Sequence, residues 1–187
     1  MASRIALFRE ELKKRNTEAA IITDEINIGY LCGYRYTDGF LLIDDRDAYL
    51  VTDGRYSEEA ALLAEKSFIV SVPEKRMAFV QEFVKGKRNL GYEERSMTVE
   101  TFHRYQDELG IEMAPLGDIL SSLRAVKTAQ EIAYIKEAQS IADAAFSHIL
   151  RVITPSITER EIALELSYFM QKHGTEEKSF EIGRAHV

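Results

Sequence analysis

Hydrophobic positions follow helical spacing in some stretches of the chain and strand spacing in others. Ile5, Phe8 and Leu12 recur at the spacing of one helix face, which predicts a helix at the start of the chain. The continuous apolar run from Ala19 to Thr23 then predicts a short strand that is buried on both sides. A helix and a buried strand in succession indicate a layered fold in which helices pack on a sheet.

A hairpin and further alternating elements follow this pair. The apolar runs Phe40–Ile43 and Ala48–Thr52 lie on either side of the charged turn 44–47, so they predict a β-hairpin. The remaining patterns predict helices at 56–65, 77–84, 98–109 and 116–123, and strands at 68–72, 90–92 and 111–113. A hairpin within such an alternation predicts the α/β class, with a mixed β-sheet flanked by helices.

The strand patterns stop near Ala125, and two helices are expected after it. Thr-x-x-Glu capping boxes at 128–131 and 158–161 predict where the two helices begin. The first is expected to reach about Ile153, before Pro155, and the second to run from Thr158 to His173.

Both helices carry an apolar stripe that has to be covered by something else. The first stripe consists of Ile132, Ile135, Ala138, Ala142, Ala145, Ile149 and Ile153, and the second of Ile162, Leu166 and Phe169. We therefore expect one domain over residues 1–125 and an incomplete second domain over residues 126–180.

The last seven residues, Glu181–Val187, have an unusual coding sequence. One codon choice for them, gag atc gga aga gca cac gtc, contains a widely used sequencing-library adapter. We therefore expect residues 181–187 to be an adapter-derived tail, with the natural gene running on differently after Phe180 or Glu181.

Composition narrows the classes of partner. Apolar residues make up 45% of the chain and charged residues 29%, which is typical of a globular protein. The net charge of -7 argues against nucleic acid, because phosphate binding needs clustered Lys and Arg. Cys32 is the single cysteine, so no internal disulfide can form and a reducing, cytoplasmic setting is expected. No apolar segment is long enough to predict a membrane span.

The segment 34–39 is the main candidate for a contact site. It places two aromatic rings, a cation and a carboxylate close together, and rings with Arg are enriched at buried interfaces. Two interpretations stay open. Tyr34, Arg35, Tyr36 and Asp38 contact a substrate or a dimer partner, or the segment is a solvated approach to the hairpin.

Other polar residues favour structural interpretations. Arg55, in the strand-to-helix turn Thr52-Asp53-Gly54-Arg55, is expected to tie this turn to a carboxylate rather than to bind a ligand. Asn27 is interpreted as the cap of a short helical segment, Ile28–Leu31. The histidines complete no recognised metal spacing, and His148 is interpreted as a helix-face residue.

Three motifs occur in a fixed order along the chain. They are Asn27-Ile28-x-Tyr30-Leu31-x-Gly33, Tyr49-Leu50-Val51-Thr52-Asp53-Gly54-Arg55-Tyr56 and Leu123-Arg124-x-x-Lys127-x-x-x-Glu131-Ile132. Thr158-Glu159-x-Glu161-Ile162-Ala163 and Ser179-Phe180 follow them. Together they resemble the proline-specific pita-bread metallopeptidases, Xaa-Pro aminopeptidase (aminopeptidase P) and Xaa-Pro dipeptidase. The resemblance covers nearly all of residues 5–180; one departure is Pro155-Ser156, where the family usually has Pro-Gly.

The resemblance implies a domain order. In that family a creatinase-type N-terminal domain precedes a pita-bread α+β catalytic domain. Residues 1–125 would then form the first domain, and residues 126–180 the first two helices of the second. The segment 34–39 of one subunit would approach the active site of its partner in a homodimer.

The resemblance also implies a chemistry. The family hydrolyses proline-containing peptides with two divalent ions, such as Mn, Co or Zn, held by two Asp, one His and two Glu. In the family's order all five ligands lie beyond residue 180, so this chain is expected to carry no catalytic and no metal-ligating residue and to be inactive alone. It would cap the active site and support oligomerisation. A non-catalytic interaction module with a pita-bread-like fold and a creatinase-like amidinohydrolase remain open as alternatives.

Overall fold

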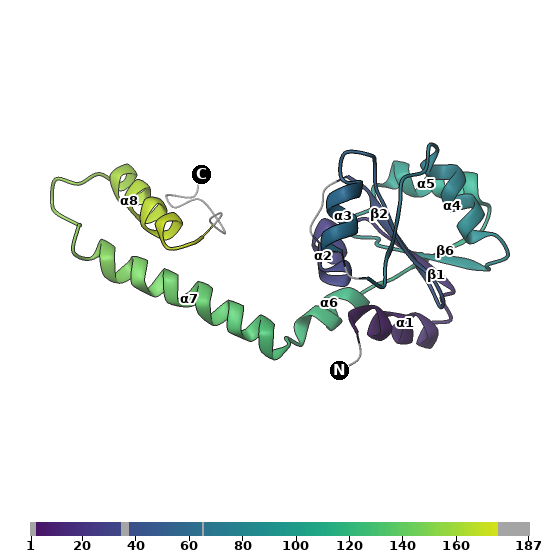
Figure 1. Ribbon diagram of the computed structural model, residues 1–187, viewed down its shortest axis with the longest axis horizontal. Helices are drawn as coiled ribbons and strands as arrows, with labels where there is room; N and C mark the ends of the chain where they lie inside the picture. Colours follow the sequence, from purple (N-terminus) through teal and green to yellow (C-terminus); the bar gives the residue numbers. More distant parts are fainter. Residues whose placement is uncertain (1–2, 35–37, 65, 176–187) are drawn as a thin grey trace. The chain divides into compact units, whose positions relative to one another are not determined.

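The computed structural model describes residues 3–34, 38–64 and 66–175 (Figure 1). The chain divides into two compact units, Met1–Val126 (unit 1) and Lys127–Val187 (unit 2), and each is described by itself. No helix within the described ranges is long and apolar enough to cross a membrane.

Unit 1 is built on a six-stranded sheet with the strand order β4-β3-β2-β1-β5-β6. The strands are β1 (Ala19–Ile22), β2 (Phe40–Asp44), β3 (Ala48–Val51), β4 (Ile69–Ser71), β5 (Asn89–Tyr92) and β6 (Glu112–Pro115). β2 pairs antiparallel with both of its neighbours, and every other pairing is parallel. The predicted hairpin and the mixed sheet are therefore confirmed.

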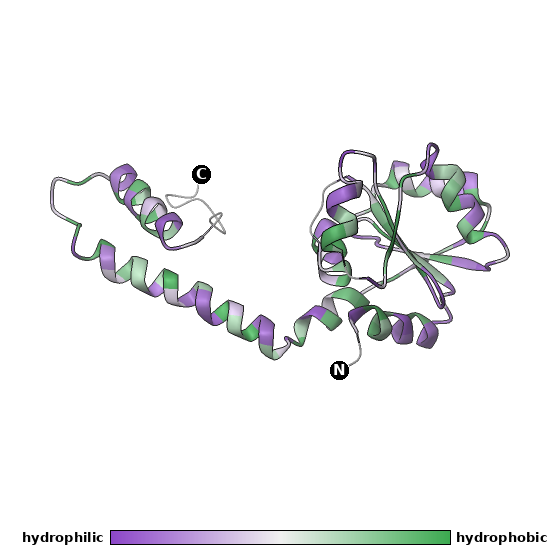
Figure 2. Cartoon of the chain, viewed as in Figure 1, coloured by the Kyte–Doolittle hydropathy of each residue, from purple (hydrophilic) through white to green (hydrophobic). Residues whose placement is uncertain are grey.

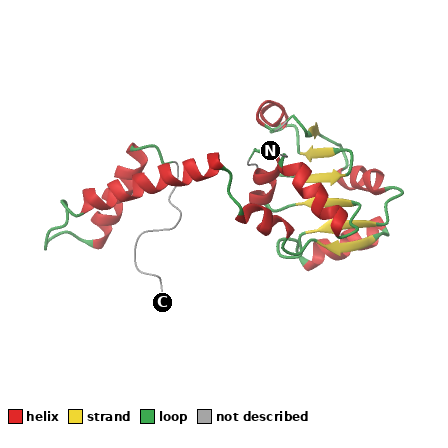
Figure 3. Ribbon diagram, turned by 90° about the horizontal axis from the view of Figure 1, so that it is seen from below, coloured by secondary structure: helices red, strands yellow, loops and turns green. Residues whose placement is uncertain are grey.

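Helices cover both faces of this sheet (Figure 3). They are α1 (Arg4–Lys14), α2 (Glu25–Cys32), α3 (Ser57–Leu63), α4 (Arg76–Val84), α5 (Val99–Leu109) and α6 (Ile119–Ala125). α1, α2, α3 and α6 contribute to one hydrophobic cluster, and α4 and α5 to the other. Successive residues of β1 point alternately into the two clusters, so the whole strand is buried and reads as a continuous apolar run.

The cap of α2 differs from the one expected. The helix begins at Glu25, and the carboxylate of Asp24 accepts the backbone N–H of Asn27 at 3.0 Å. Asp24 is therefore the N-cap, and the interpretation of Asn27 as the cap is wrong. Asp24 has the extended backbone of a capping residue and lies three residues before the amide that it binds. The helix therefore begins at Glu25 rather than at Ile28.

Unit 2 consists of α7 (Ala129–Ile149) and α8 (Glu159–Lys172). Both predicted capping boxes are present, at Thr128 with Glu131 and at Thr158 with Glu161. α7 ends at Ile149 rather than near Ile153. The residues after it form tight turns, in which the amides of Arg151 and Val152 bond to carbonyls three positions back, and helical conformation is disfavoured directly ahead of Pro155.

The apolar stripes of unit 2 are largely exposed. In α7 only Ala145 and Ile149 are buried, whereas Ile135 keeps 54% of its surface accessible. α8 has no buried residue. Figure 2 shows hydrophobic positions as green bands along both helices. Contact between the two helices therefore buries only a small part of their two apolar stripes.

Candidate functional site

One edge of the sheet carries two clusters of polar side chains that join separate elements of unit 1. β1, β3, β4, β5 and β6 run in the same direction, so their carboxyl ends meet at this edge, where β2 begins. Open sheets of this kind bind their ligands outside the carboxyl ends of the strands. Tyr34 and Asp38 of the candidate segment lie here, together with two polar clusters.

The first cluster surrounds Asp38, directly before β2. Arg76 at the start of α4 donates to Asp38 twice, to Oδ1 at 3.3 Å and to the backbone carbonyl oxygen at 3.2 Å. Arg55 donates to the Asp38 carboxylate and also, at 2.5 Å, to Oδ2 of Asp53. The expectation that Arg55 ties its turn to a carboxylate is confirmed, and the structure adds a second carboxylate from the start of β2.

The cluster is solvated but strongly ion-paired. The Arg55 side chain is 70% exposed and that of Asp38 38% exposed. The hydrogen bond from Arg55 lowers the pKa of Asp53 to about 2, since the guanidinium stabilises the ionised carboxylate. Asp38 is thus held in place by two cations while part of its carboxylate still faces solvent.

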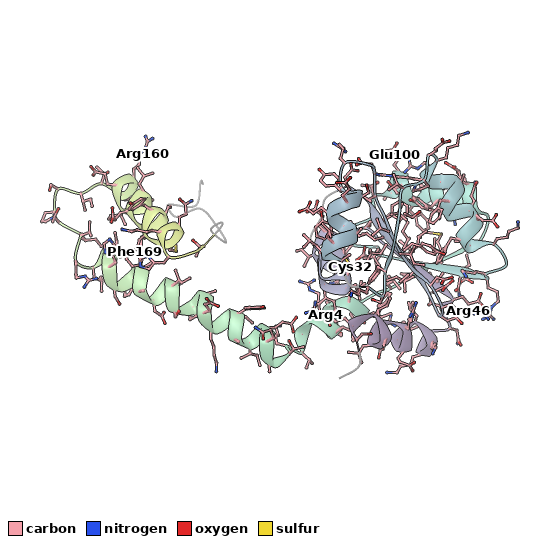
Figure 4. The ribbon with its side chains drawn as sticks, in the orientation of Figure 1. Arg4, Cys32, Arg46, Glu100, Arg160 and Phe169 are labelled. Carbon is pink, nitrogen blue, oxygen red and sulfur yellow. The ribbon has the colours of Figure 1, made fainter. Side chains whose placement is uncertain are left out.

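Tyr34 fixes the other end of the segment. Gly33, with φ of 73°, ends α2 in the left-handed conformation, and Tyr34 follows with only 7% of its surface exposed. Its hydroxyl donates to Glu59 Oε2 on α3 at 2.8 Å, and Cys32 Sγ donates to its carbonyl oxygen at 3.3 Å. Cys32 is labelled in Figure 4.

Of the four candidate residues, Tyr34 and Asp38 are therefore anchored to neighbouring helices. The other two, Arg35 and Tyr36, lie outside the described residues.

The second cluster is centred on Glu93, which the sequence did not single out. Glu93 follows β5 and is only 7% exposed. Its Oε2 accepts the backbone N–H groups of Thr23 at 2.6 Å and Asp24 at 2.9 Å, and its Oε1 accepts Asn27 Nδ2 at 2.7 Å. Arg124 Nη1 of α6 donates to Oδ1 of the same Asn27 at 3.0 Å.

Burial raises the pKa of Glu93 above its usual range, and the charge of Asp24 adds to the rise, although the three N–H donors oppose it. A cavity of about 210 Å³ lies beside this cluster, with Glu93, Asn27, Leu116 and Arg124 in its wall. The sequence did not indicate that Glu93 is buried, because Glu93 begins the charged run Glu93-Glu94-Arg95, and such runs are typical of solvated surface. Its position directly after an apolar strand was the available signal.

In unit 2, aromatic rings and a hydrogen bond between side chains join the two helices. His148 Nε2 of α7 lies 2.6 Å from Glu165 Oε1 of α8, and the imidazole stacks on Phe169 at 4.5 Å between ring centroids. Phe169 stacks in turn on His173 at 4.1 Å. Phe169 lies on the side of α8 that faces α7 (Figure 4). His148 is thus a helix-face residue that packs α7 against α8, as its sequence position indicated.

Comparison with known families decides the identity of unit 1. The profile of the creatinase/prolidase N-terminal domain matches residues 4–126. The chain belongs to the creatinase/prolidase N-terminal domain family. The profile of metallopeptidase family M24 matches residues 133–185 of the same chain. The two matches follow each other in the order that the sequence motifs suggested.

Individual relatives of this creatinase/prolidase domain agree with the assignment. The uncharacterised peptidase YqhT of Bacillus subtilis is 32% identical over 170 residues, which are 88% of this chain and 48% of YqhT. An Xaa-Pro dipeptidase structure from Bacillus anthracis superposes with a TM-score of 0.88 at 32% identity, over 94% of this chain and 50% of the dipeptidase.

A third relative is a structure of one domain only. The N-terminal domain of the cytoplasmic peptidase PepQ from Mycobacterium tuberculosis superposes with a TM-score of 0.58 at 28% identity, over 64% of this chain and 97% of that domain. By contrast, the chain spans about half the length of the full-size relatives that it matches.

The second family is one of metallopeptidases, which hold metal ions with His, Asp and Glu side chains. Within the described ranges, no group of three or more His, Cys, Asp or Glu residues is placed to hold a metal ion. His148 and Glu165 form a pair, and both are engaged in joining α7 to α8. These residues do not fit a two-metal centre, and no catalytic step can be derived from them.

Proposed function

We propose that this chain is the N-terminal part of a proline-specific metalloexopeptidase, an Xaa-Pro aminopeptidase or an Xaa-Pro dipeptidase. One observation carries the proposal: a creatinase/prolidase N-terminal domain is followed, in the same chain, by the beginning of a match to metallopeptidase family M24. On this proposal residues 1–125 are the N-terminal domain, residues 126–180 begin the catalytic domain, and residues 181–187 are the adapter-derived tail.

The role proposed for unit 1 is to cap the active site and to support a homodimer. Asp38 supports it, because two arginines hold this carboxylate at the sheet edge while it remains part-exposed and able to accept further hydrogen bonds. Tyr34 is an anchor in this arrangement, since its ring is buried and its hydroxyl already donates to Glu59. Arg35 and Tyr36 are proposed to complete the contact with substrate or partner subunit.

The chemistry proposed for the full-length protein is hydrolysis of proline-containing peptides. Two divalent ions, Mn, Co or Zn, would stabilise the attacking and leaving oxygens there, with two Asp, one His and two Glu beyond residue 180 as ligands. A single cysteine, buried in unit 1, supports a reducing, cytoplasmic setting. This chain by itself is proposed to bind no metal pair tightly and to be inactive.

The test is to recover the parent reading frame past Phe180 and to assay its product on Xaa-Pro dipeptides and on longer peptides with proline at the second position. We expect metal-dependent cleavage by the full-length protein and none by the 187-residue chain, with calorimetric titration of Mn²⁺, Co²⁺ and Zn²⁺ as the binding readout. Asp38→Asn in the full-length protein should lower peptidase efficiency, and Asp107→Asn, an exposed change on α5, should not. Turnover that scales with the purified 187-residue chain would contradict the proposal.

A second candidate follows from the family itself, because its description joins creatinase with prolidase. A creatinase-like amidinohydrolase would cleave creatine and leave Xaa-Pro peptides intact. If the parent frame lacks a bridging carboxylate, a non-catalytic interaction module is favoured over both enzymes. Adding creatine to the same set of substrates therefore separates all three, because the interaction module would cleave neither creatine nor Xaa-Pro peptides.

A further inference from the structure

The Glu93–Asn27–Arg124 chain of hydrogen bonds joins three parts of unit 1. Glu93 follows β5, Asn27 belongs to α2 and Arg124 belongs to α6. These parts are far apart in the sequence, so each bond closes a long loop of backbone. α2 leads through Gly33 into the candidate segment 34–39, and α6 is the last element of unit 1.

Arg124 determines the direction of each hydrogen bond in the Glu93–Asn27–Arg124 chain. A guanidinium can only donate, so Arg124 requires the oxygen of the Asn27 amide to face it. The amide nitrogen of Asn27 then faces Glu93, and it too can only donate. Glu93 Oε1 must therefore be an acceptor.

The second oxygen of Glu93 is committed in the same way. Two backbone N–H groups, those of Thr23 and Asp24, donate to Oε2 at 2.6 and 2.9 Å. The hydroxyls of Thr23 and Ser96 lie farther away, at 3.4 and 3.5 Å. Oε2 thus accepts two N–H groups at short distance and Oε1 accepts one, so a proton has room on the second lone pair of Oε1, where it makes this oxygen a weaker acceptor.

We propose that Glu93 is a proton-controlled positioning residue: the ionised carboxylate holds α6 against α2 through Asn27 and Arg124, and protonation weakens that tether. The proton comes from solvent and adds to a carboxylate oxygen. Asn27 then donates to a neutral carboxyl group, which is a weaker acceptor than the carboxylate, and Asn27 is held less firmly in the position at which its oxygen meets Arg124. The inference concerns contacts within unit 1 and does not depend on the proposed peptidase function.

Tyr30 of α2 also bonds to this end of α6. The hydroxyl of Tyr30 donates to the backbone carbonyl oxygen of Leu123 at 3.2 Å, and neither group titrates in the acid range. Loss of the Glu93–Asn27–Arg124 chain therefore loosens the end of α6 rather than detaching it. Tyr30 also supplies a tether that is independent of pH.

The charged groups facing Glu93 come from every element around it. Asp24 precedes α2, Glu94 and Arg95 follow Glu93, and Arg124 extends from α6; all of them line the same cavity. Because burial raises the pKa of Glu93, it titrates at higher pH than Asp53 or Asp118, whose pKa values are lowered by Arg55 and Arg15. The weakening of the tether is thus expected at higher pH than the loss of those surface ion pairs.

Protonation of Glu93 weakens the local contact but increases the free energy of unfolding of unit 1. A carboxyl group whose pKa is raised by folding contributes stability below its unfolded pKa, and this contribution is lost as the pH rises through the folded pKa. Mild acidification therefore does not unfold unit 1 through Glu93. It loosens one local contact while the sheet stays intact.

Hydrogen exchange of the 187-residue chain tests the proposal. Protection factors, which correct for the intrinsic effect of pH, are measured for the amides of Leu123, Arg124 and Ala125 from neutral to mildly acidic pH. We expect them to fall about tenfold, since a charge-assisted hydrogen bond becomes a neutral one, while the melting temperature of unit 1 does not fall. Glu93→Gln should show the low protection at every pH, because its side chain is neutral at every pH and its NH2 group meets N–H donors on one side.

Three further variants make the result decisive. Asn27→Ala leaves the backbone bonds to Glu93 in place and should reproduce the low, pH-independent protection if Glu93→Gln fails to fold. Tyr30→Phe should lower protection at all pH values but keep the pH-dependent step. Glu112→Gln makes the same charge change on the exposed face of β6 and should behave like the natural chain. Protection at α6 that stays level on acidification of the natural chain, or that keeps its pH step in Asn27→Ala, would overturn the proposal.

Discussion

Units 1 and 2 contain amphipathic helices of similar quality, yet only unit 1 has a closed core. In α1 the side chains of Ile5, Phe8 and Leu12 are all buried, because a sheet face receives them. In α8 no side chain is buried, although its apolar stripe is equally regular. An amphipathic pattern therefore identifies the face that has to be covered and leaves open whether the cover is present.

Proteolysis is expected to show the largest difference between the units. At about 25 cal/mol per Å² of apolar surface, the exposed apolar stripes of α7 and α8 lack several kcal/mol of stabilisation by burial. This is a large share of a domain's free energy of unfolding. We expect limited proteolysis of the chain to degrade or clip residues 126–187 and to leave a product that ends near Ala125. A sample in which unit 2 drives self-association would agree equally well. Equal resistance of both segments in a monomeric sample would contradict the comparison.

Core substitutions should separate the units on a smaller scale. Phe8 is fully buried in unit 1, so Phe8→Ala is expected to lower the free energy of unfolding by about 3–5 kcal/mol. Phe146 in α7 is 64% exposed, and Phe146→Ala should change it by less than about 0.5 kcal/mol. Chemical denaturation followed by circular dichroism measures both. A loss of similar size in the two variants would mean that α7 is covered after all.

The smallest expected effect concerns the ion pairs around Arg55. The pKa of Asp53 is depressed to about 2, so its contribution to stability is present above the pKa of an unfolded aspartate and is lost as the pH falls through about 2. Carboxyl NMR titration should find this low value, and Arg55→Gln should return Asp53 toward an ordinary aspartate. Arg46→Gln, an exposed change in the turn between β2 and β3, is the control. An ordinary pKa for Asp53 in the natural chain would show that Arg55 does not hold it in solution.

Local chemistry explains which features could be predicted from the sequence. Strands, helices and the two Thr-x-x-Glu caps are set by residues within a few positions of each other, and the structure confirms them. The bond between Arg55 and Asp53 is local in the same sense. The cap of α2 is also local, because Asp24 lies directly before the helix, but the motif that begins at Asn27 favoured Asn27 as the cap.

Long-range bonds explain which features could not be predicted. Glu93 meets Asn27 from 66 positions away, and Arg76 meets Asp38 from 38 positions away. Neither partner can be recognised without knowing which strands are neighbours. For the candidate segment 34–39, the sequence could indicate only which residue types are present. The burial of Tyr34 and its hydrogen bond to Glu59 depend on the packing of α3.

The position of β1 at the centre of the sheet bears on the order in which unit 1 assembles. On one side β2 pairs with β3 through a tight turn and with β1 across the segment that holds α2; on the other side Ala20 pairs with Gly91 of β5 only after a much longer stretch of chain. Closing a short loop costs less entropy, so the β1–β2–β3 meander is expected to form in the folding nucleus before β5 and β6 join it. Leu42→Ala should then slow refolding, whereas Leu90→Ala should mainly accelerate unfolding, as stopped-flow measurements on both variants would reveal. During synthesis, half of the sheet would already be paired before the ribosome has released the strands that complete it.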